Sequence, residues 1–397
     1  MNTYWALAWA GNSAKGTTML YRSMSLAPLS LFKSLGPIER KVLNCEKREC
    51  SSCLNVYESK QRCVWVMRYK VLGRTGLKMS ALSCGTNRLR MKTQENADVV
   101  LNYALDRGMN FIETGRPYGP TEEMVGKAVS NRREEYNIAA KTVLFSREGV
   151  KREVDLSLQA LRTDYMDIYE IIFGREEELQ KILGEDGALQ ALLEAKEEGK
   201  IGFIGVGGHR PDLLAQALKT GHFDTVLFHF NMVQPRALYE LIPIAREVGA
   251  GTLVMRPIAH GALAPVSRTL RFPLSCPGVD IVLCGMYSTS EIDENMAISE
   301  VEPTHEEWES LLTEAEALGN TGCTLCGYCS VCPKKIPIGS IMTLIRYRQK
   351  HSLLPESEAQ WKNYAEKAKT CDECGLCEEK CPYDLSIIPV IQEASLT

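Results

Sequence analysis

An alternation of apolar runs and amphipathic stretches is the feature that most restricts how this chain can fold. The apolar, strand-like runs are MSALSCG (79–85), NFIETG (110–115), NIAAKTV (137–143), MDIYEIIF (166–173), IGFIGVGG (201–208), TVLFHFN (225–231), GTLVMRPI (251–258) and DIVLCGM (280–286). Stretches such as ENADVVLNYALDRG and DGALQALLEAKEEGK lie between them, with apolar residues at intervals of three and four and Gly near the end, as in amphipathic helices. Strands and helices that alternate over about 250 residues predict an α/β fold, a (β/α)8 TIM barrel.

An open, doubly wound sheet is the alternative fold for such an alternation. That fold usually has a Gly-rich phosphate loop after its first strand, and CGTNRLR (84–90) is not such a loop. Before the first run, RYKVLGRTGLKMS (68–80) predicts a short hairpin with a Gly-containing turn.

Two cysteine runs near the end of the chain predict metal binding. Of 15 cysteines, Cys323, Cys326, Cys329 and Cys332 form C-x2-C-x2-C-x2-C-P, and Cys371, Cys374, Cys377 and Cys381 form C-x2-C-x2-C-x3-C-P. In two-cluster ferredoxins three closely spaced cysteines bind one cluster, and the fourth, before Pro, binds the other. We therefore expect two [4Fe–4S] clusters, one held by the first three cysteines of the first run with Cys381, the other by the first three of the second run with Cys332.

A pair of structural zinc sites is the alternative for these cysteines, although zinc sites usually use paired C-x2-C knuckles. The segment between the runs reads as two helices broken near Pro355, so residues 319–397 resemble an α-helical ferredoxin-like domain. Clustered cysteines in a long chain also indicate a reducing compartment, and we expect a cytoplasmic location.

Residues 1–66 differ in texture from the rest and form an atypical N-terminal extension. No acidic residue precedes Glu39, and Ser is common. A transit-like peptide and a mis-assigned start, with Met67 as the true first residue, are both compatible with this composition. The spacing of Cys45, Cys50, Cys53 and Cys63 superficially matches plant-type ferredoxins, without their surroundings. We expect the barrel to occupy 67–318.

Bulk properties exclude two classes of partner. The net charge is −4, and no basic run is interleaved with aromatic residues, so nucleic acid is not an expected partner. No apolar run approaches the ~18 residues of a membrane helix, so no membrane association is expected.

Four segments resemble the aldo/keto reductase family, in its branch with a C-terminal 4Fe–4S ferredoxin-like domain. They are FIETGRPYG, NIAAKT, DLSLQALRTDYMDIYEI and GMYSTSEIDEN, in the order and spacing of the family. The resemblance covers residues 67–397. It implies a barrel enzyme that uses NAD(H) or NADP(H) to reduce or oxidise a small carbonyl or alcohol substrate.

The resemblance also implies catalytic residues at the ends of strands. Tyr118 matches the family's proton donor and Lys141 its lysine, while Glu113 replaces the aspartate that pairs with that lysine. A phenol is a poor acid at neutral pH unless a cation favours its anion, which is the role implied for Lys141. The family's histidine position holds Ile172, a departure that leaves His229 and His260 as conceivable substitutes.

The nucleotide pocket implied by the resemblance is only partly retained. Side chains that would hold the carboxamide fall at Gly207, Gly208 and Leu227, which carry no donor or acceptor, and Met255 takes the position that stacks on nicotinamide. The adenosine end is implied at Gly285, Ser288, Glu291 and Asn295. Glu291 would favour NAD through the ribose 2′-hydroxyl, Arg256 could reverse the preference toward NADP, and Glu291 could equally be a solvated helix-start acid.

The sequence therefore predicts an iron–sulfur oxidoreductase of the aldo/keto reductase type. Its clusters would transfer electrons between the barrel and a redox protein partner, or would serve structurally in a domain that caps the barrel mouth. The alternative is a non-catalytic electron carrier or binding protein on a degenerate barrel, which Ile172, Gly207 and Leu227 favour.

Overall fold

The computed structural model describes residues 67–397 except 260–264, 319–322, 324–325, 351–354 and 382. The predictions made for residues 1–66, including the spacing of Cys45, Cys50, Cys53 and Cys63, and for His260 lie outside the described residues. Barrel and cysteine-rich segment fall within one compact unit, Glu39–Thr397.

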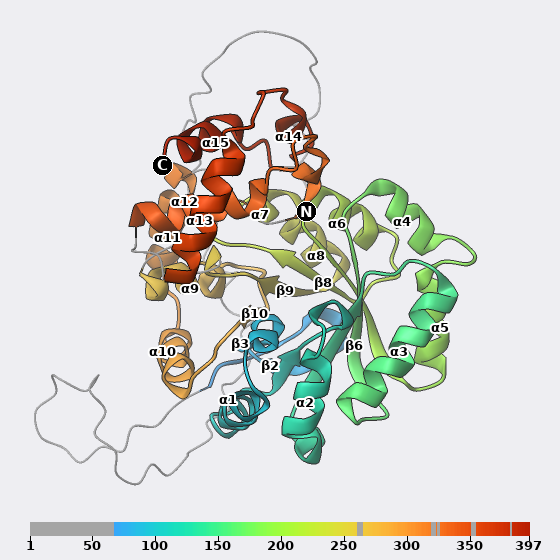
Figure 1. Ribbon diagram of the computed structural model, residues 1–397. Coiled ribbons are helices and arrows are strands. Elements are labelled where there is room, and N and C mark those ends of the chain that lie inside the picture. The colour runs from blue at the N-terminus through green and yellow to red at the C-terminus, as the bar shows by residue number, and fades with distance from the viewer. Residues whose placement is uncertain (1–66, 260–264, 319–322, 324–325, 351–354, 382) are drawn as a thin grey trace, which may run out of the picture. The chain divides into compact units, whose positions relative to one another are not determined.

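A closed barrel of parallel strands forms the centre of the molecule (Figure 1). Its order is β10-β3-β4-β5-β6-β7-β8-β9, with each strand beside its neighbour in sequence and β10 closing onto β3. The strands are β3 (Leu82–Gly85), β4 (Phe111–Glu113), β5 (Asn137–Thr142), β6 (Met166–Phe173), β7 (Ile201–Gly208), β8 (Thr225–His229), β9 (Gly251–Met255) and β10 (Ile281–Cys284). The prediction of a (β/α)8 barrel is confirmed.

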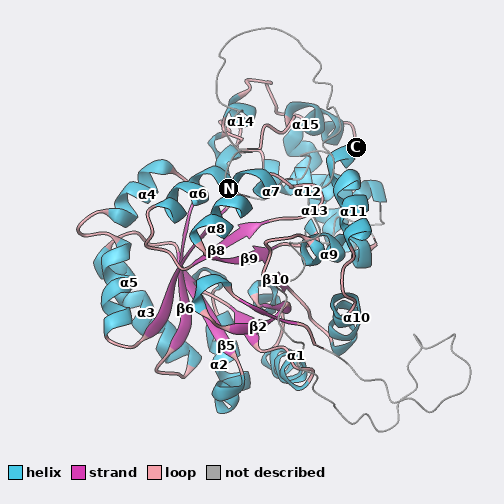
Figure 2. Cartoon of the chain, turned by 180° about the vertical axis from the view of Figure 1, so that it is seen from behind, coloured by secondary structure: helices cyan, strands magenta, loops and turns pink. Residues whose placement is uncertain are grey.

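Helices surround the strands, as Figure 2 shows. They are α1 (Gln94–Asp106), α2 (Thr121–Val129), α3 (Arg147–Leu161), α4 (Glu176–Leu183), α5 (Ala188–Glu197), α6 (Pro211–Lys219), α7 (Ala237–Glu240), α8 (Ile242–Val248), α9 (Val266–Ser275), α10 (Thr289–Glu300) and α11 (His305–Leu318). Side-chain caps begin several of them: Thr93 accepts from Asn96 N at 3.3 Å, and Ser146 from Gly149 N at 3.3 Å. Short 3-10 helices are η2 (Gly73–Thr75), η3 (Asn87–Met91), η4 (Arg116–Tyr118) and η5 (Ser130–Glu135).

The predicted hairpin contributes to the apolar core inside the barrel. Strands β1 (Tyr69–Val71) and β2 (Lys78–Ser80) pair antiparallel. From this hairpin, the fully buried Leu72 and Met79 pack with the strand residues Ile168 and Leu253 in one apolar cluster inside the barrel, the lumen cluster. The lumen is therefore packed, and its polar residues must find partners within it.

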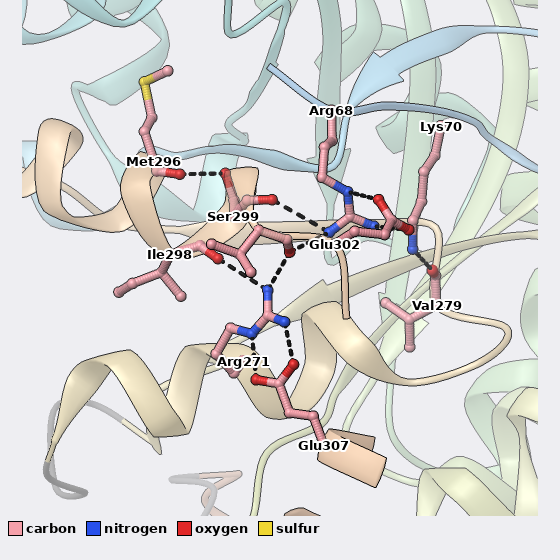
Figure 3. Close-up of polar contacts among 10 residues, drawn as sticks. Arg68, Lys70, Arg271, Val279, Met296, Ile298, Ser299, Glu302 and Glu307 are labelled. Atoms are coloured by element: carbon pink, nitrogen blue, oxygen red, sulfur yellow. Dashed lines mark hydrogen bonds and ion pairs between the residues drawn. The ribbon is translucent and has the colours of Figure 1, made fainter. Parts of the chain in front are cut away.

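Two arginines hold the connection between α10 and α11, as Figure 3 shows. Arg271 is 7% exposed, forms a two-pronged ion pair with Glu307, and donates from Nη1 to the carbonyls of Ile298 and Val301. Arg68, ahead of β1, donates to Ser299 O at 3.3 Å. Cations at the C-terminal carbonyls of α10 complement its dipole, so these contacts stabilise the packing of α10 and α11.

The cysteine-rich segment forms a small helical domain. Its elements are η7 (Tyr328–Val331), α12 (Ile338–Lys350), α13 (Pro355–Ala368), α14 (Leu376–Glu379) and α15 (Ile388–Ser395). Trp361, Ile341 and Ile391 form its apolar centre, against which several cysteines pack. The two helices expected between the cysteine runs, broken near Pro355, are confirmed. In the described part of the chain, no helix combines the length and apolarity required to span a membrane.

Candidate functional site

A buried acid and a buried lysine lie at the C-terminal ends of adjacent strands, where barrels of this type carry their active sites. Glu113 ends β4 and is 4% exposed, and Lys141, near the end of β5, is 2% exposed. Tyr118 follows on η4, five residues after Glu113. The structure thus brings together the three residues that the sequence proposed as catalytic.

Glu113 lies between the other two residues. Tyr118 Oη donates to Glu113 Oε1 at 3.1 Å, and Lys141 Nζ forms an ion pair with the same oxygen. Lys141 Nζ also lies 4.7 Å from the centroid of the Tyr118 ring. Gly115 makes room for this arrangement, because a Cβ there would collide with Cγ of Lys141. Any side chain at position 115 would displace the lysine.

The turn that carries Tyr118 is anchored by an ion pair between a half-buried arginine and a buried acid, neither of which was expected from the sequence. Arg116 Nη1 lies 2.9 Å from Glu122 Oε2, and Ser157 Oγ donates to Glu122 Oε1 at 2.9 Å. Glu122 is fully buried, and burial raises the pKa of its carboxyl while Arg116 and Ser157 oppose the rise. The sequence signal is modest: an arginine two residues before Tyr118 and an acid four residues after it.

The electrostatics of Tyr118 differ from the expectation. Burial raises the pKa of its phenol, Glu170 on β6 raises it further, and Arg256 and Arg90 oppose the rise. The net direction is upward, whereas the sequence predicted that Lys141 would lower this pKa. The physical reason is the burial of the phenol, which disfavours its anion, together with the negative charge of Glu170.

Ile172, at the position implied for the family's histidine, has apolar neighbours in the structure. Ile172 lies near the end of β6 and packs in the lumen cluster. A Cβ on Gly207 of β7 would lie 2.5 Å from Ile172 Cδ1 and 3.1 Å from Leu227 Cβ. Ile172, Gly207 and Leu227 have no polar side-chain atom that could donate a hydrogen bond to a substrate.

A pair of histidines lies on the two strands that follow. His229 ends β8, His209 directly follows β7, and their rings meet edge-on with centroids 4.4 Å apart. Burial lowers the pKa of His209 to about 3, with Arg256 adding to the effect, so this imidazole is neutral. The sequence had proposed His229 but not His209, whose signal was a histidine immediately after a strand.

The residues proposed for the nicotinamide end lie at the end of β9. Met255 is the last residue of β9 and packs in the lumen cluster. Arg256 adopts the left-handed region at φ 54°, and its carbonyl accepts from Asn231 Nδ2 at 3.1 Å. Burial lowers the pKa of the Arg256 guanidinium, with Tyr118 the first of the groups that oppose the effect.

The residues proposed for the adenosine end surround the start of α10. Gly285 follows β10, and Asn295 is buried with Nδ2 3.7 Å from Cys284 Sγ. Ser288 Oγ accepts from Glu291 N at 3.2 Å, and Glu291 Oε2 accepts from Tyr287 N at 2.6 Å. Glu291 therefore contacts the start of α10, and its role toward a ribose hydroxyl stays a prediction.

Two cations that the sequence analysis missed flank Tyr287. Arg88 Cζ lies 5.6 Å and Lys92 Nζ 5.0 Å from the centroid of its ring. Both come from the segment after β3 and bring positive charge beside the N-terminus of α10. Cations beside a helix N-terminus favour an anionic group, such as the phosphates of a nucleotide.

The cysteines line two hollows, each of which draws on both runs. One hollow, of about 370 Å³ of atom-free space partly open to solvent, is lined by Cys323, Cys326, Cys329 and Cys381. The other, of about 350 Å³, is lined by Cys332, Cys371, Cys374 and Cys377. Burial and the three other thiols of its hollow raise the pKa of Cys329 to about 11.

These hollows fit iron–sulfur clusters. Within the described ranges, no three His, Cys, Asp or Glu side chains converge as ligands of a single metal ion. Four thiols spaced around a hollow suit a multinuclear cluster, whose irons each take one thiolate. The two sets of four are those expected from the sequence.

The barrel and the helical domain make direct contact near the histidine pair. Tyr383, two residues after Cys381, donates its hydroxyl to the carbonyl of His209. Arg236, beside α7, places Cζ 5.9 Å from the centroid of the Tyr383 ring. Cys381, which lines the first of the two hollows, is therefore two residues from a side chain that contacts the barrel at His209.

Comparison with protein families matches both parts of the chain. Residues 81–270 match the model of the aldo/keto reductase family, and residues 322–386 match a 4Fe-4S dicluster domain. Both matches fall inside the ranges predicted for the two domains, whose boundaries remain predictions.

Individual relatives agree with the family models. L-galactose dehydrogenase of Arabidopsis thaliana is 30% identical over 303 residues, which are 63% of this chain and 93% of that protein. NADH-specific methylglyoxal reductase of Escherichia coli is 27% identical over 48% of this chain and 68% of that protein.

Solved structures show the same fold. An aldo-keto reductase of Bacillus halodurans superposes with a TM-score of 0.55 at 24% identity, over 64% of this chain and 96% of that one. One of Klebsiella pneumoniae, in complex with NADPH, gives 0.54 at 20% identity, over 62% and 94%. By its barrel and by these relatives, the chain belongs to the aldo/keto reductase family and carries a C-terminal 4Fe-4S dicluster domain.

Proposed function

We propose that this protein is an iron–sulfur oxidoreductase that interconverts a small carbonyl compound and its alcohol with a nicotinamide cofactor. The observation that carries the proposal is the contact of Tyr118 and Lys141 with one carboxylate oxygen of Glu113 at the strand ends of the barrel. A phenol, a carboxylate and an ammonium group in contact can hold and pass a proton beside a reacting oxygen. The relatives named as dehydrogenase and reductase agree with this chemistry.

The residues of this chain then have distinct roles. Tyr118 gives its proton to the carbonyl oxygen during reduction and takes it back during oxidation. Glu113 holds the hydroxyl of Tyr118 in place, and Lys141 places its positive charge against the buried carboxylate of Glu113. Nicotinamide, when bound, supplies or accepts the hydride. The raised pKa of Tyr118 keeps this residue protonated at rest, as a proton donor must be.

The histidine pair is our candidate for the missing carbonyl donor. His209 is neutral because burial lowers its pKa, so one ring nitrogen carries a hydrogen and the other does not. A neutral imidazole can donate to a carbonyl oxygen without adding a charge. The pair lies at the ends of β7 and β8, beside Ile172 on β6.

The residues at the start of α10 fit the adenosine end of a dinucleotide. Ser288 presents a hydroxyl, and Arg88 and Lys92 present positive charge beside the same helix start. Arg256 and Met255 lie at the end of β9, where the nicotinamide end is proposed. We propose that either NADH or NADPH binds here, and that Arg88 and Lys92 are the groups that would accept a 2′-phosphate.

Two [4Fe–4S] clusters, one in each cysteine hollow, would supply one-electron steps to the two-electron chemistry of the barrel. The hydrogen bond from Tyr383 to His209 supports electron transfer between the first hollow and the barrel mouth. A redox protein would then exchange electrons with the clusters. The reducing interior of the cytoplasm is the location that suits such thiolate ligands.

The test of the enzyme is carbonyl reduction by the full chain, compared between wild type and Tyr118→Phe. Phe keeps the ring over Lys141 and removes the proton, so turnover should fall about 100-fold or more while the nucleotide still binds. Unchanged turnover in Tyr118→Phe would exclude the assigned proton donor.

The alternative, an electron carrier on a barrel without catalysis, is favoured by the apolar group of Ile172, Gly207 and Leu227. An anaerobic mixture with NADH or NADPH separates the two functions. Bleaching of the iron–sulfur absorbance, together with nucleotide oxidation, would support an enzyme connected to its clusters. Intact clusters in a protein that binds neither nucleotide would support the carrier.

A further inference from the structure

A second acidic residue lies inside the barrel and plays no part in the chemistry of the family. Glu170 occupies the middle of β6, between Ile168 and Ile172, which pack in the lumen cluster. Because side chains of a strand alternate between its two faces, Glu170 shares the inner face with these isoleucines. It is fully buried.

Among the described residues, Glu170 has one ion-pair contact. Its Oε2 lies 4.0 Å from Lys141 Nζ, on the strand paired with β6 and in the same register position. Neither carboxylate oxygen has a hydrogen-bond partner among the described residues. A buried carboxylate without hydrogen bonds is costly when ionised, so the site favours a proton on Glu170.

The residues that pack around Glu170 include one further polar atom. In the same row of the barrel, Gly205 on β7 and Thr225 on β8 follow Glu170. A Cβ at Gly205 would lie 2.9 Å from Glu170 Cγ and 2.5 Å from Thr225 Oγ1. The hydroxyl of Thr225 is buried and, within the described ranges, also lacks a partner. Together with Lys141, these residues therefore form a closely packed polar row in the lumen.

We propose that Glu170 is the internal proton store of the barrel site and exchanges its proton with Lys141. The chain of contacts runs from Tyr118 through Glu113 and Lys141 to Glu170. It ends in the lumen instead of in solvent. The inference deepens the proposed function, on which its catalytic part rests.

The proton balance of alcohol oxidation shows what the store does. The substrate O–H bond breaks as Tyr118 Oη gains that proton and passes its own to Glu113. Lys141 receives the proton from Glu113 and releases another from Nζ to Glu170. The substrate C–H bond breaks with its electron pair, which leaves as hydride to oxidised nicotinamide. Glu170 ends neutral, and reduction of a carbonyl runs the same steps backward.

The charges that face this pair set its pH dependence. Burial raises the pKa of Glu170, and Lys141 opposes the rise. Burial lowers the pKa of Lys141, Glu170 opposes that effect, and Arg256 adds to it. Glu113 on β4 contacts Lys141, and Tyr118 on η4 contacts Glu113. On the other side of Glu170, the neighbouring residues Gly205 on β7 and Thr225 on β8 have no titratable side chain. The two pKa values therefore approach each other, which is the condition for easy proton exchange.

Infrared difference spectroscopy during a pH titration of the full protein tests the store directly, without turnover. A carboxylic-acid C=O band that titrates well above the usual range of Glu should be present in wild type and absent from Glu170→Gln. The matched control is Ile168→Val, which changes the packing of the same face and should keep the band. A Glu170→Gln protein that retains every titrating band would overturn the proposal.

A second variant keeps the test decisive where Glu170→Gln does not fold. Lys141→Met retains Glu170 and removes its only nearby cation in the described structure, so the band should move to higher pH by about one unit or more. A band that does not move would show that Glu170 and Lys141 do not exchange protons.

The pH profile of turnover then separates this inference from the proposed function. In Glu170→Gln the profile of carbonyl reduction should lose one ionisation, and Glu170→Asp should restore it in part. Turnover with an unchanged profile would overturn the store alone. A band that responds as described, in a wild type that turns over no carbonyl with either nucleotide, would overturn the proposed function alone.

Discussion

Tyr118 donates its hydroxyl hydrogen to Glu113 Oε1 at 3.1 Å, and Lys141 contacts the same oxygen. The carboxylate therefore bridges the phenol hydroxyl and the ammonium group, which also lies 4.7 Å from the centroid of the Tyr118 ring. Glu113 is one methylene longer than the aspartate that the family resemblance implies at this position, and its carboxylate contacts Tyr118.

The first prediction concerns this carboxylate. Glu113→Gln keeps the shape but removes the charge that balances Lys141, so carbonyl turnover should fall at least about 10-fold. Glu113→Asp is the control, because its shorter side chain keeps the negative charge but moves the carboxylate away from the Tyr118 hydroxyl. Steady-state kinetics should give the order wild type, Asp, Gln, and equal activity of Asp and Gln variants would contradict a role of the charge.

The second prediction concerns His209 and acid stability. Its pKa is lowered by burial from 6.5 to about 3 in the folded protein, so the unfolded chain binds the proton more readily between these values. Stability should therefore fall as the pH drops below 6.5, by about 2 kcal/mol of unfolding free energy at pH 5 from this residue alone. Denaturant unfolding at a series of pH values measures this loss. In His209→Gln the unfolding free energy should fall less steeply as the pH drops below 6.5. The same dependence of unfolding free energy on pH in both proteins would contradict the burial of a neutral imidazole at His209.

The third prediction concerns the exchange of ligands between the cysteine runs. Cys381 lines the hollow of Cys323, Cys326 and Cys329, and Cys332 lines the hollow of Cys371, Cys374 and Cys377. Cys381→Ser should therefore alter the same electron paramagnetic resonance signal as Cys323→Ser, and Cys332→Ser the signal altered by Cys371→Ser. Spectra of the reduced, anaerobically prepared variants decide this. If Cys381→Ser and Cys371→Ser altered the same signal instead, each run would bind its own cluster.

The fourth prediction concerns the arginine that joins α10 and α11. Arg271→Ala leaves Glu307 and the carbonyls of Ile298 and Val301 without their donor, and should cost about 2–4 kcal/mol of unfolding free energy. The control is Arg268→Ala on the same helix, whose ion pair with Glu314 is 43% and 41% exposed and should contribute about 0–1 kcal/mol. Equal shifts of the denaturant midpoint in both variants would contradict a special role of the buried pair.

The sequence predicted the barrel well because its strands are buried on both faces and read as apolar runs. The ranges predicted for β6 and β7 match the structure residue for residue. The run at 79–85 was wrong as a single strand, since it divides into the hairpin strand β2 and the barrel strand β3. Asn110 Oδ1 accepts from Ser80 N at 2.7 Å, and Ser80 contacts Ser83, so side-chain bonds turn the chain where the apolar pattern continues.

The site was predictable only where strand ends converge. Parallel strands of a barrel end on one face, so Glu113 and Lys141 were expected together, with Tyr118 in the following loop. Arg116, Glu122, His209 and Glu170 were missed, because their importance depends on partners distant in sequence. Glu170 in particular reads as an ordinary polar position of a strand until closure of the barrel buries it beside Lys141.

The narrow gap at Gly205 has an evolutionary consequence. Even a methyl group at position 205 would press on Glu170 Cγ and Thr225 Oγ1, so the acid is tolerated only opposite glycine. Among relatives, positions 170 and 205 should therefore covary, with larger residues at 205 appearing where 170 has become small. A descendant could lose the acid in one mutation, but could regain it only after its neighbour had reverted to glycine.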